Sequence, residues 1–154
     1  MTNPTRIVAF TFGLGLAAGC STTTSMDVSS QNLAGYVGGA PWSFAAGETD
    51  AFLSEGQDDF FATLYPAAYT PCSSQTPSGP YLIVSIPKAP GTYDFDSTRN
   101  ITFVADSADN LVSFDGTIVV DAVAADHVSG GLASSYDGNN EVNGQFVLTV
   151  CSED

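Results

Sequence analysis

Short apolar runs separated by turn residues occupy most of the chain after residue 40. In residues 101–105 apolar and polar positions alternate, as they do in a strand with one buried face. The run 81–86 (YLIVSI) is apolar almost throughout and ends at Pro87, which is typical of a strand buried on both faces. No window combines a sustained helical period with caps at both ends. Nine strands are predicted, at residues 42–44, 60–65, 81–86, 91–95, 101–105, 111–114, 117–124, 128–136 and 142–151.

Turn residues between these runs indicate how the strands are connected. Asp115 and Gly116 form a strong turn pair, and the segment 137–141 (DGNNE) marks the clearest hairpin. Short strands at a spacing of about ten residues are typical of an antiparallel β-sandwich or barrel. The fold prediction is therefore an all-β domain of about nine short strands.

The first twenty residues follow a different pattern. A short polar stretch ends at Arg6, an uncharged apolar run covers residues 7–16, and small residues follow at positions 17–19 before Cys20. An apolar run of ten is too short to span a bilayer, which needs about twenty residues. A cationic start, a short apolar middle and a small-residue exit predict a secretory signal peptide over residues 1–19.

The small residues that lead to Cys20 resemble the lipobox of bacterial lipoproteins. Leu16 lies one place further from the cysteine than in the commonest arrangement, and Ala17 takes its position. The resemblance implies cleavage between Gly19 and Cys20 and lipid on the Cys20 sulfur, hence a membrane partner. Ser21 stands where an Asp would suggest retention in the inner membrane, so the outer membrane is the expected location.

After the signal, the chain divides by composition into a tether and one domain. Residues 20–32 are rich in Ser and Thr and predict a flexible tether, so the folded β-domain is expected at residues 33–154. The whole chain has 3 basic and 17 acidic residues, for a net charge of −14. Removing Arg6 leaves 2 − 17 = −15, which repels phosphate backbones and excludes nucleic acid as a partner.

Cys72 and Cys151 remain as a pair once Cys20 is lipidated. An even pair in an oxidising compartment predicts a disulfide, with two free thiols or half of a metal site as alternatives. In the last strand, Phe146, Leu148 and Val150 share one face, so Cys151 points to the other. The disulfide is then expected on the outer side of the sheet, or at a loop crossing there, unless the strand end twists.

Four segments in the C-terminal half carry a second resemblance. They are IPKAPGTYDF, GTIVVDAV, HVSGGLASSY and VNGQFVLTVC, and they resemble small β-rich lipoproteins of unknown function from Gram-negative bacteria. The resemblance implies a sandwich-like domain whose final cysteine is bonded inward. It supplies no catalytic residues.

Candidate chemistry is sparse. His127 is the only histidine, no G-x-S-x-G motif accompanies it, and a small hydrolase is therefore only an alternative. The acidic pairs that such an enzyme could use follow strand ends and turns, where Asp commonly bonds the backbone. These pairs are Asp58/Asp59, Asp94/Asp96 and Asp106/Asp109.

Two binding alternatives rest on oxygen ligands and on aromatic side chains. No cofactor is expected, but calcium would find carboxylate and amide oxygens in two loops, at Asp94, Asp96 and Asn100 and at Asp137 and Glu141. Aromatic residues concentrated in the first half could line a groove for a glycan or a protein partner. They are Tyr36, Trp42, Phe60, Phe61, Tyr65, Tyr69 and Tyr81. The leading hypothesis is a lipid-anchored, non-enzymatic binding or structural module of the cell envelope.

Overall fold

The computed structural model describes residues 25–51, 54, 56–105 and 110–152. Every regular element among them is a β-strand, which confirms the all-β prediction, and none of them forms a helix able to cross a membrane. The eleven strands are β1 (Ala34–Val37), β2 (Ala40–Ser43), β3 (Ala46–Asp50), β4 (Asp59–Tyr65), β5 (Tyr81–Pro87), β6 (Gly91–Asp94), β7 (Ile101–Val104), β8 (Asn110–Ser113), β9 (Gly116–Val123), β10 (His127–Asp137) and β11 (Asn140–Cys151).

Nine of these strands coincide with the predicted segments, and β1 and β3 were missed. The sequences AGYV and AGETD give them no alternating apolar pattern. Backbone pairing with neighbouring strands holds them in place: β1 lies between β2 and β11, and β3 lies between β4 and β11. Strands of this kind leave little trace in a hydrophobic pattern.

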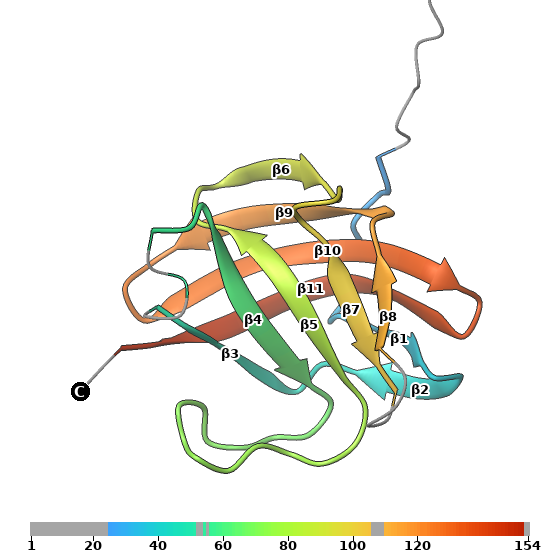
Figure 1. Cartoon of the computed structure of the whole chain (residues 1–154), viewed down its shortest axis with the longest axis horizontal. Helices are drawn as coiled ribbons and strands as arrows, with labels where there is room; N and C mark the ends of the chain where they lie inside the picture. Colours follow the sequence, from blue (N-terminus) through green and yellow to red (C-terminus); the bar gives the residue numbers. More distant parts are fainter. Residues whose placement is uncertain (1–24, 52–53, 55, 106–109, 153–154) are drawn as a thin grey trace, which may run out of the picture.

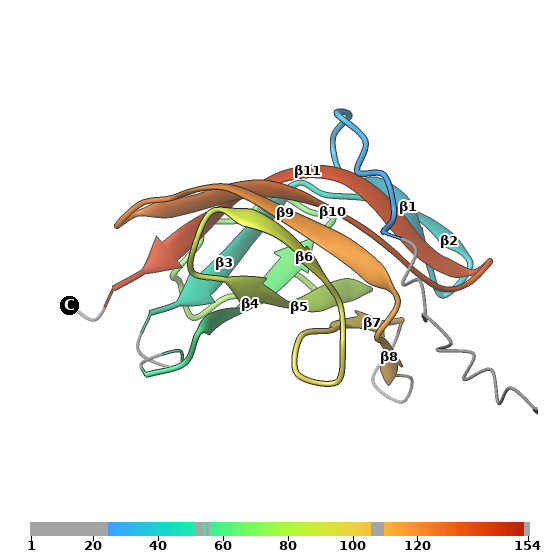
Figure 2. The ribbon, with the colours of Figure 1, turned by 90° about the horizontal axis from the view of Figure 1, so that it is seen from above.

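The strands form one curled sheet in the order β6-β9-β10-β11-β3-β4-β5-β7-β8, with the β1–β2 hairpin attached to β11 (Figure 1). All neighbours are antiparallel except β11 and β3, which run parallel through Thr149–Glu48 and the two following pairs. The sheet is therefore mixed, where an antiparallel one was predicted. Seen from above, it curves into a half-barrel in which β9, β10 and β11 lie opposite β4, β5 and β7 (Figure 2).

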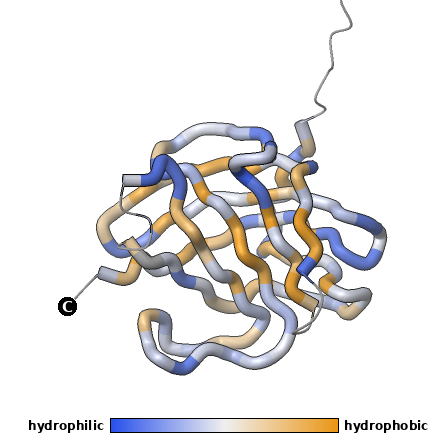
Figure 3. The backbone as a smooth tube through the Cα atoms, in the orientation of Figure 1, coloured by the Kyte–Doolittle hydropathy of each residue, from blue (hydrophilic) through white to orange (hydrophobic). Residues whose placement is uncertain are grey.

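The core fills the concave side of the curled sheet. The largest fully buried side chain there is Phe103 in β7, and the opposing layer contributes Leu132 in β10 and Leu148 in β11. Apolar stretches mark the middles of the strands, whereas the loops at their ends are hydrophilic (Figure 3). In β5, alternate residues are fully buried and Tyr81, Ile83 and Ser85 are only half-buried, so this strand is not buried on both faces as predicted.

Side chains close the gap between β8 and β10, which have no backbone pairing. The Ser113 hydroxyl donates to the carbonyl oxygen of Ser135 at 2.9 Å, and the Ser134 hydroxyl donates to that of Asp115 at 2.7 Å. Both serines are buried, so these bonds are shielded from competing water. They keep the half-barrel curled around its core.

Residues 25–29 lie on the outer, convex face of β9, β10 and β11, and residues 31–32 pair with the edge of β11 at Gln145. This corrects the assignment of residues 25–32 to a flexible tether. The amide of Met26 donates to the Thr117 hydroxyl at 2.8 Å, and that of Ser29 donates to the Asn143 side-chain oxygen at 2.7 Å. The side-chain amide of Gln145 donates to the Ser29 carbonyl oxygen at 2.7 Å. The segment is held mainly through its own backbone amides and carbonyls, which bond polar side chains of the sheet.

Two glycines make room for this segment. A Cβ on Gly131 would lie 2.6 Å from a methyl carbon of Val28, and one on Gly144 would lie 2.6 Å from the carbonyl oxygen of Gln31. Gly144 also has a φ of 144°, which side chains rarely adopt. The sheet is therefore shaped to receive the segment.

We predict that Asn143→Ala releases residues 25–32 from the convex face. The Asn143 side chain accepts from Ser29 and donates to the carbonyl oxygen of Asp27 at 3.0 Å. Losing both bonds should cost about 1–2 kcal/mol of local stability. Faster hydrogen exchange at Ser29, with unchanged exchange in β4 and β5, is the expected measurement. Val147→Ala, an exposed change on the same strand, serves as the control and should leave Ser29 protected.

Candidate functional site

A cleft of about 630 Å³ opens where β4 begins and β5 ends. Asp59 and Phe61 alternate with core-facing residues of β4 and so point to the outer face, and Ser85 is the cross-strand partner of Phe61. The β3–β4 connection supplies Gln57 and Asp58, and the loop before β7 supplies Thr98 and Arg99. The hydrophilic stretches at the start of β4 and before β7 lie at this same end of the sheet (Figure 3).

A bidentate ion pair forms one wall of this cleft. Arg99 donates from Nε to Oδ2 of Asp59 at 3.0 Å and from Nη2 to Oδ1 at 2.9 Å. The side chains of Arg99 and Asp59 are 18% and 19% exposed, so solvent screens them only partly. The guanidinium also lies over the Tyr93 ring, 4.8 Å from its centroid. The bidentate pair with Asp59 and the stacking on the Tyr93 ring therefore fix the orientation of the Arg99 guanidinium.

The loop that carries Arg99 is closed by Asp96. Oδ1 of Asp96 accepts hydrogen bonds from the hydroxyl and the amide of Thr98 and from the amide of Arg99. The amide of Asp96 in turn donates to the Arg99 carbonyl oxygen at 2.7 Å. The hydrogen bonds from Thr98 and Arg99 lower the pKa of Asp96 to about 2. The loop therefore presents Arg99 from a preformed turn.

Lys88 adds a second cation to this region. Its Nζ donates to the carbonyl oxygen of Ser54, which lines the cleft, and lies 5.1 Å from the centroid of the Phe60 ring. Lys88 and Arg99 are the only basic residues among those described, and they stand against Asp58 and Asp59 here. Among the described residues of this region, two cations and two carboxylates sum to zero, in a chain of net charge −14.

An aromatic side chain is left open at the cleft. Phe61 is 56% exposed, although the neighbouring residues of β4, Phe60 and Ala62, are buried. The amide of Phe61 donates to the Ser54 hydroxyl at 3.1 Å, and its carbonyl oxygen accepts from Thr49 at 3.0 Å. Its backbone is thus fixed on both sides while its ring faces solvent.

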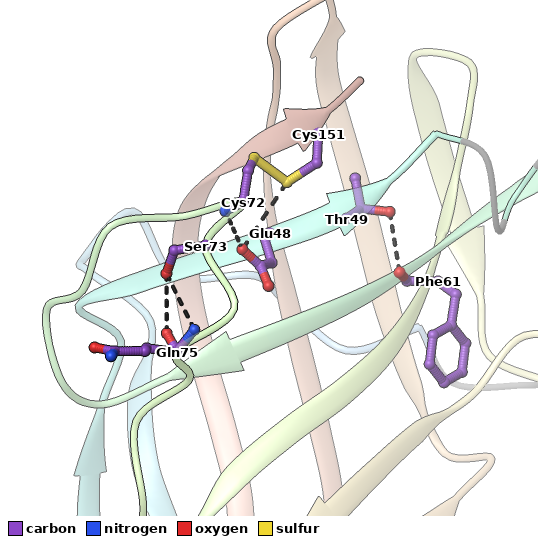
Figure 4. The surroundings of a disulfide bond; sticks show 7 residues. All are labelled: Glu48, Thr49, Phe61, Cys72, Ser73, Gln75 and Cys151. Carbon is purple, nitrogen blue, oxygen red and sulfur yellow. Dashed lines mark hydrogen bonds between the residues drawn. A yellow bond between two sulfur atoms is a disulfide. The ribbon is translucent and has the colours of Figure 1, made fainter. Parts of the chain in front are cut away.

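The predicted disulfide joins Cys72 to Cys151, with the two Cα atoms 5.4 Å apart (Figure 4). Cys151 ends β11 on the outer side of the sheet and is half-buried, while Cys72 is exposed in the loop between β4 and β5. The disulfide therefore ties down a crossing loop, which was one of the open alternatives. The inward bonding implied by the resemblance is wrong, because the opposite face of β11 already holds Phe146 and Leu148 in the core.

Glu48 organises the surroundings of this disulfide. Its Oε2 accepts from the amide of Cys72 at 2.5 Å and lies 3.9 Å from the Cys151 sulfur, which carries no proton in the disulfide (Figure 4). Cys72 has a φ of 64° and is the one non-glycine residue with positive φ among those described. The bond to Glu48 supports this conformation. Burial raises the pKa of Tyr69, with a further contribution from the Glu48 carboxylate.

The calcium candidates do not gather into one site. Asp96 uses one oxygen within its own turn, and Asp94 accepts from the Thr117 hydroxyl at 3.3 Å. In the other loop, Asp137 accepts from the amide of Asn139 and the side chain of Asn140, while Glu141 pairs with Tyr36 across to β1. Among the described residues, the one group of three candidate ligands within 4.8 Å is Glu48 with the two disulfide-bonded cysteines. Sulfurs shared in a disulfide are poor metal ligands.

The residues considered for hydrolysis are also dispersed. His127 bonds Asp126 at 2.7 Å at the start of β10, and in the described hydrogen bonds no serine hydroxyl reaches its ring. That bond lowers the pKa of Asp126. Asp59 is occupied by Arg99. The pair Asp106/Asp109 lies outside the described residues, as do Gly19 and Cys20.

The first-half aromatic residues do not line one groove. Trp42 and Phe60 are buried in the core, whereas Tyr36 and Phe61 are exposed on different strands. The remaining three tyrosines form a separate group, with the Tyr65 ring centroid 5.2 Å from Tyr69 and 5.5 Å from Tyr81. Of the seven, Phe60 and Phe61 line the cleft beside Arg99.

The sequence does not single out Arg99, which lies between Asp96 and Asn100 in the loop considered for calcium. The signal that could have found the site is the rarity of basic residues, since two of three lie at positions 88 and 99. Nothing in the sequence pairs Arg99 with Asp59, because 40 residues separate them. No known protein family model, curated protein or solved structure matches this chain.

We predict that replacing both cysteines by Ser lowers the free energy of unfolding by up to about 4 kcal/mol. The disulfide spans 79 residues, and a loop of that length gives about this value in the chain-entropy model. Urea unfolding provides the measurement. Adding reductant to the wild type should produce the same shift, and reductant should not affect the variant. Equal stability of reduced and oxidised wild type would contradict the prediction.

A double-mutant cycle on Asp59→Asn and Arg99→Gln should give a coupling of about 1–2 kcal/mol. This value is intermediate between those of exposed and buried ion pairs, in line with the exposure of the two side chains. The exposed pair Asp126 and His127 is the control, and its cycle should give a smaller coupling because solvent screens both side chains. Coupling at Arg99 no greater than at His127 would show that the cleft wall is not preformed.

Proposed function

We propose that this chain is a lipid-anchored binding protein of the bacterial cell envelope, held at the outer membrane through Cys20, with the cleft at Arg99 and Asp59 as its binding site. The proposal for the anchor rests on the signal-like residues 1–19 and the cysteine that follows them. The proposal for binding in place of catalysis rests on the chemistry of the cleft.

The closed Arg99–Asp59 pair is the observation that carries the binding role. A general acid needs a carboxyl group whose pKa is raised, and a nucleophile needs a base within hydrogen-bond reach. In the cleft, Asp59 is paired with a cation and Asp96, which closes the neighbouring turn, has a pKa lowered to about 2. Groups that are charged, paired and fixed in orientation are suited to recognition.

The position of residues 25–32 supports a short connection to the lipid. With these residues bonded to the convex face, only residues 21–24 separate Cys20 from the bound segment at Ser25. Five residue steps reach at most about 18 Å. A lipid on Cys20 would therefore hold the Thr117 end of that face close to the bilayer. Two or three acyl chains make such an anchor effectively permanent.

We predict that Cys20→Ser moves the protein from the membrane fraction to the soluble fraction. Without the thiol no acyl chain can be attached, and about 0.8 kcal/mol of membrane affinity is lost for each methylene. Fractionation of cells that express the full chain, followed by immunoblotting, provides the measurement.

Ser21→Ala is the matched control and should remain in the membrane fraction. Ser21→Asp tests the location, because it should shift the protein from the outer to the inner membrane. Membrane retention of Cys20→Ser at the wild-type level would overturn the proposed anchor. The proposed binding role of the cleft would then apply to a protein whose location is set in another way.

A further inference from the structure

The Arg99–Asp59 pair can offer a ligand both hydrogen-bond donors and hydrogen-bond acceptors. In the hydrogen bonds among the described residues, Arg99 uses two of the five N–H donors of a guanidinium, which leaves three for a ligand. Asp59 uses two acceptor sites of the roughly four on a carboxylate. Donors and acceptors therefore lie side by side in one fixed plane. A hydroxyl group both donates and accepts, so it can bond both partners at once without separating them.

We propose that this cleft binds a neutral saccharide, with its hydroxyls on the Arg99–Asp59 pair and the C–H face of a sugar ring on Phe61. The inference rests on the proposed binding function and names the ligand class of the same site.

Phe61 provides the apolar half of such a site. The face of an aromatic ring carries partial negative charge and attracts the weakly positive C–H groups on the face of a pyranose. Phe61 is 56% exposed, so covering its ring with an apolar surface is favourable and contributes to the free energy of binding. Its fixed backbone, bonded through Ser54 and Thr49, means that little order has to be created when a ligand binds.

Local charge excludes the other small ligands. An anion would meet a guanidinium that is already neutralised, in a chain of net charge −14. A cation would find Asp59 occupied by Arg99, and Asp58 is the one other carboxylate among the described residues that line the cleft. A purely apolar ligand would leave the ion pair covered and its remaining groups unsatisfied. A neutral, polyhydroxylated ligand meets none of these penalties.

The cleft is also of suitable size. Its volume of about 630 Å³ lies within the range of about 300–1,000 Å³ that is usual for small-molecule sites. Polar groups surround it on several sides, with Ser85 on β5, Thr98 before β7 and Gln57 before β4. A bound sugar can therefore be held by hydroxyl contacts around its rim while Phe61 covers one face.

The test is a titration of the purified full-length protein with neutral oligosaccharides of glucose, in α- and β-linked forms, and of N-acetylglucosamine, followed by NMR. The expected result is saturable shifts at residues 54–61, 85 and 98–99 with at least one of them. Phe61→Ala should weaken that binding by about tenfold or more, and Arg99→Lys, which keeps the charge but loses the planar fork, should also weaken it.

Phe114→Ala is the matched control, because Phe114 is 54% exposed and does not line the cleft. It should bind the oligosaccharide as the wild type does, and its melting temperature should agree with that of Phe61→Ala. An oligosaccharide that contains uronic acid probes the charge argument and should bind more weakly than its neutral counterpart.

Three results would overturn the saccharide proposal: no shifts at millimolar oligosaccharide, shifts confined to residues outside the cleft, or equal binding by Phe61→Ala. Preference for the uronic-acid ligand would overturn it as well, while leaving the proposed binding function intact. Failure of the anchor is read separately, from the fractionation of Cys20→Ser, which does not depend on any ligand.

Discussion

The fold depends on the way one long strand, β11, divides its backbone hydrogen bonds. One edge of β11 pairs with β10 along most of its length, and the other edge is shared between β1 near Val142 and β3 near Val150. β1 and β3 come from the start of the domain and β11 from its end, and β3 is the parallel neighbour. Because unpaired backbone groups are costly in a core, this constraint brings the start and the end of the domain together. It also places Cys151 where the loop that carries Cys72 can reach it.

The sequence predicted the elements that a hydrophobic pattern can encode. The all-β class, nine strands, the 137–141 hairpin and the Cys72–Cys151 pair follow from apolar periodicity, turn chemistry and cysteine counting. The two missed strands lack an apolar stripe, and their pairing is decided by the backbone of distant neighbours. The docking of residues 25–32 was missed for a related reason. A free tether and a segment bonded to the sheet can have the same polar composition, so composition alone does not distinguish them.

The candidate site was beyond sequence reasoning because it depends on contacts between distant segments. Arg99 reaches Asp59 only because β5 brings the start of β4 beside the loop before β7. The turn closed by Asp96 was considered only as a calcium loop, because the sequence does not show that Asp96 bonds the backbone amides of Thr98 and Arg99. Composition gave one indication of the site. The chain has only three basic residues, and two of them, Arg99 and Lys88, lie in or beside this cleft.

The curl of the sheet connects the anchor to the cleft. Residues 25–32 cover the outer face of β9, β10 and β11, whereas Asp59 and Phe61 lie on the outer face of β4, across the core (Figure 2). If lipid on Cys20 keeps the first of these faces near the bilayer, the second faces away from it. A tether that remained free would impose no such orientation. Docking of the N-terminal segment would therefore orient the proposed anchor, with the proposed binding cleft on the side of the domain away from the bilayer.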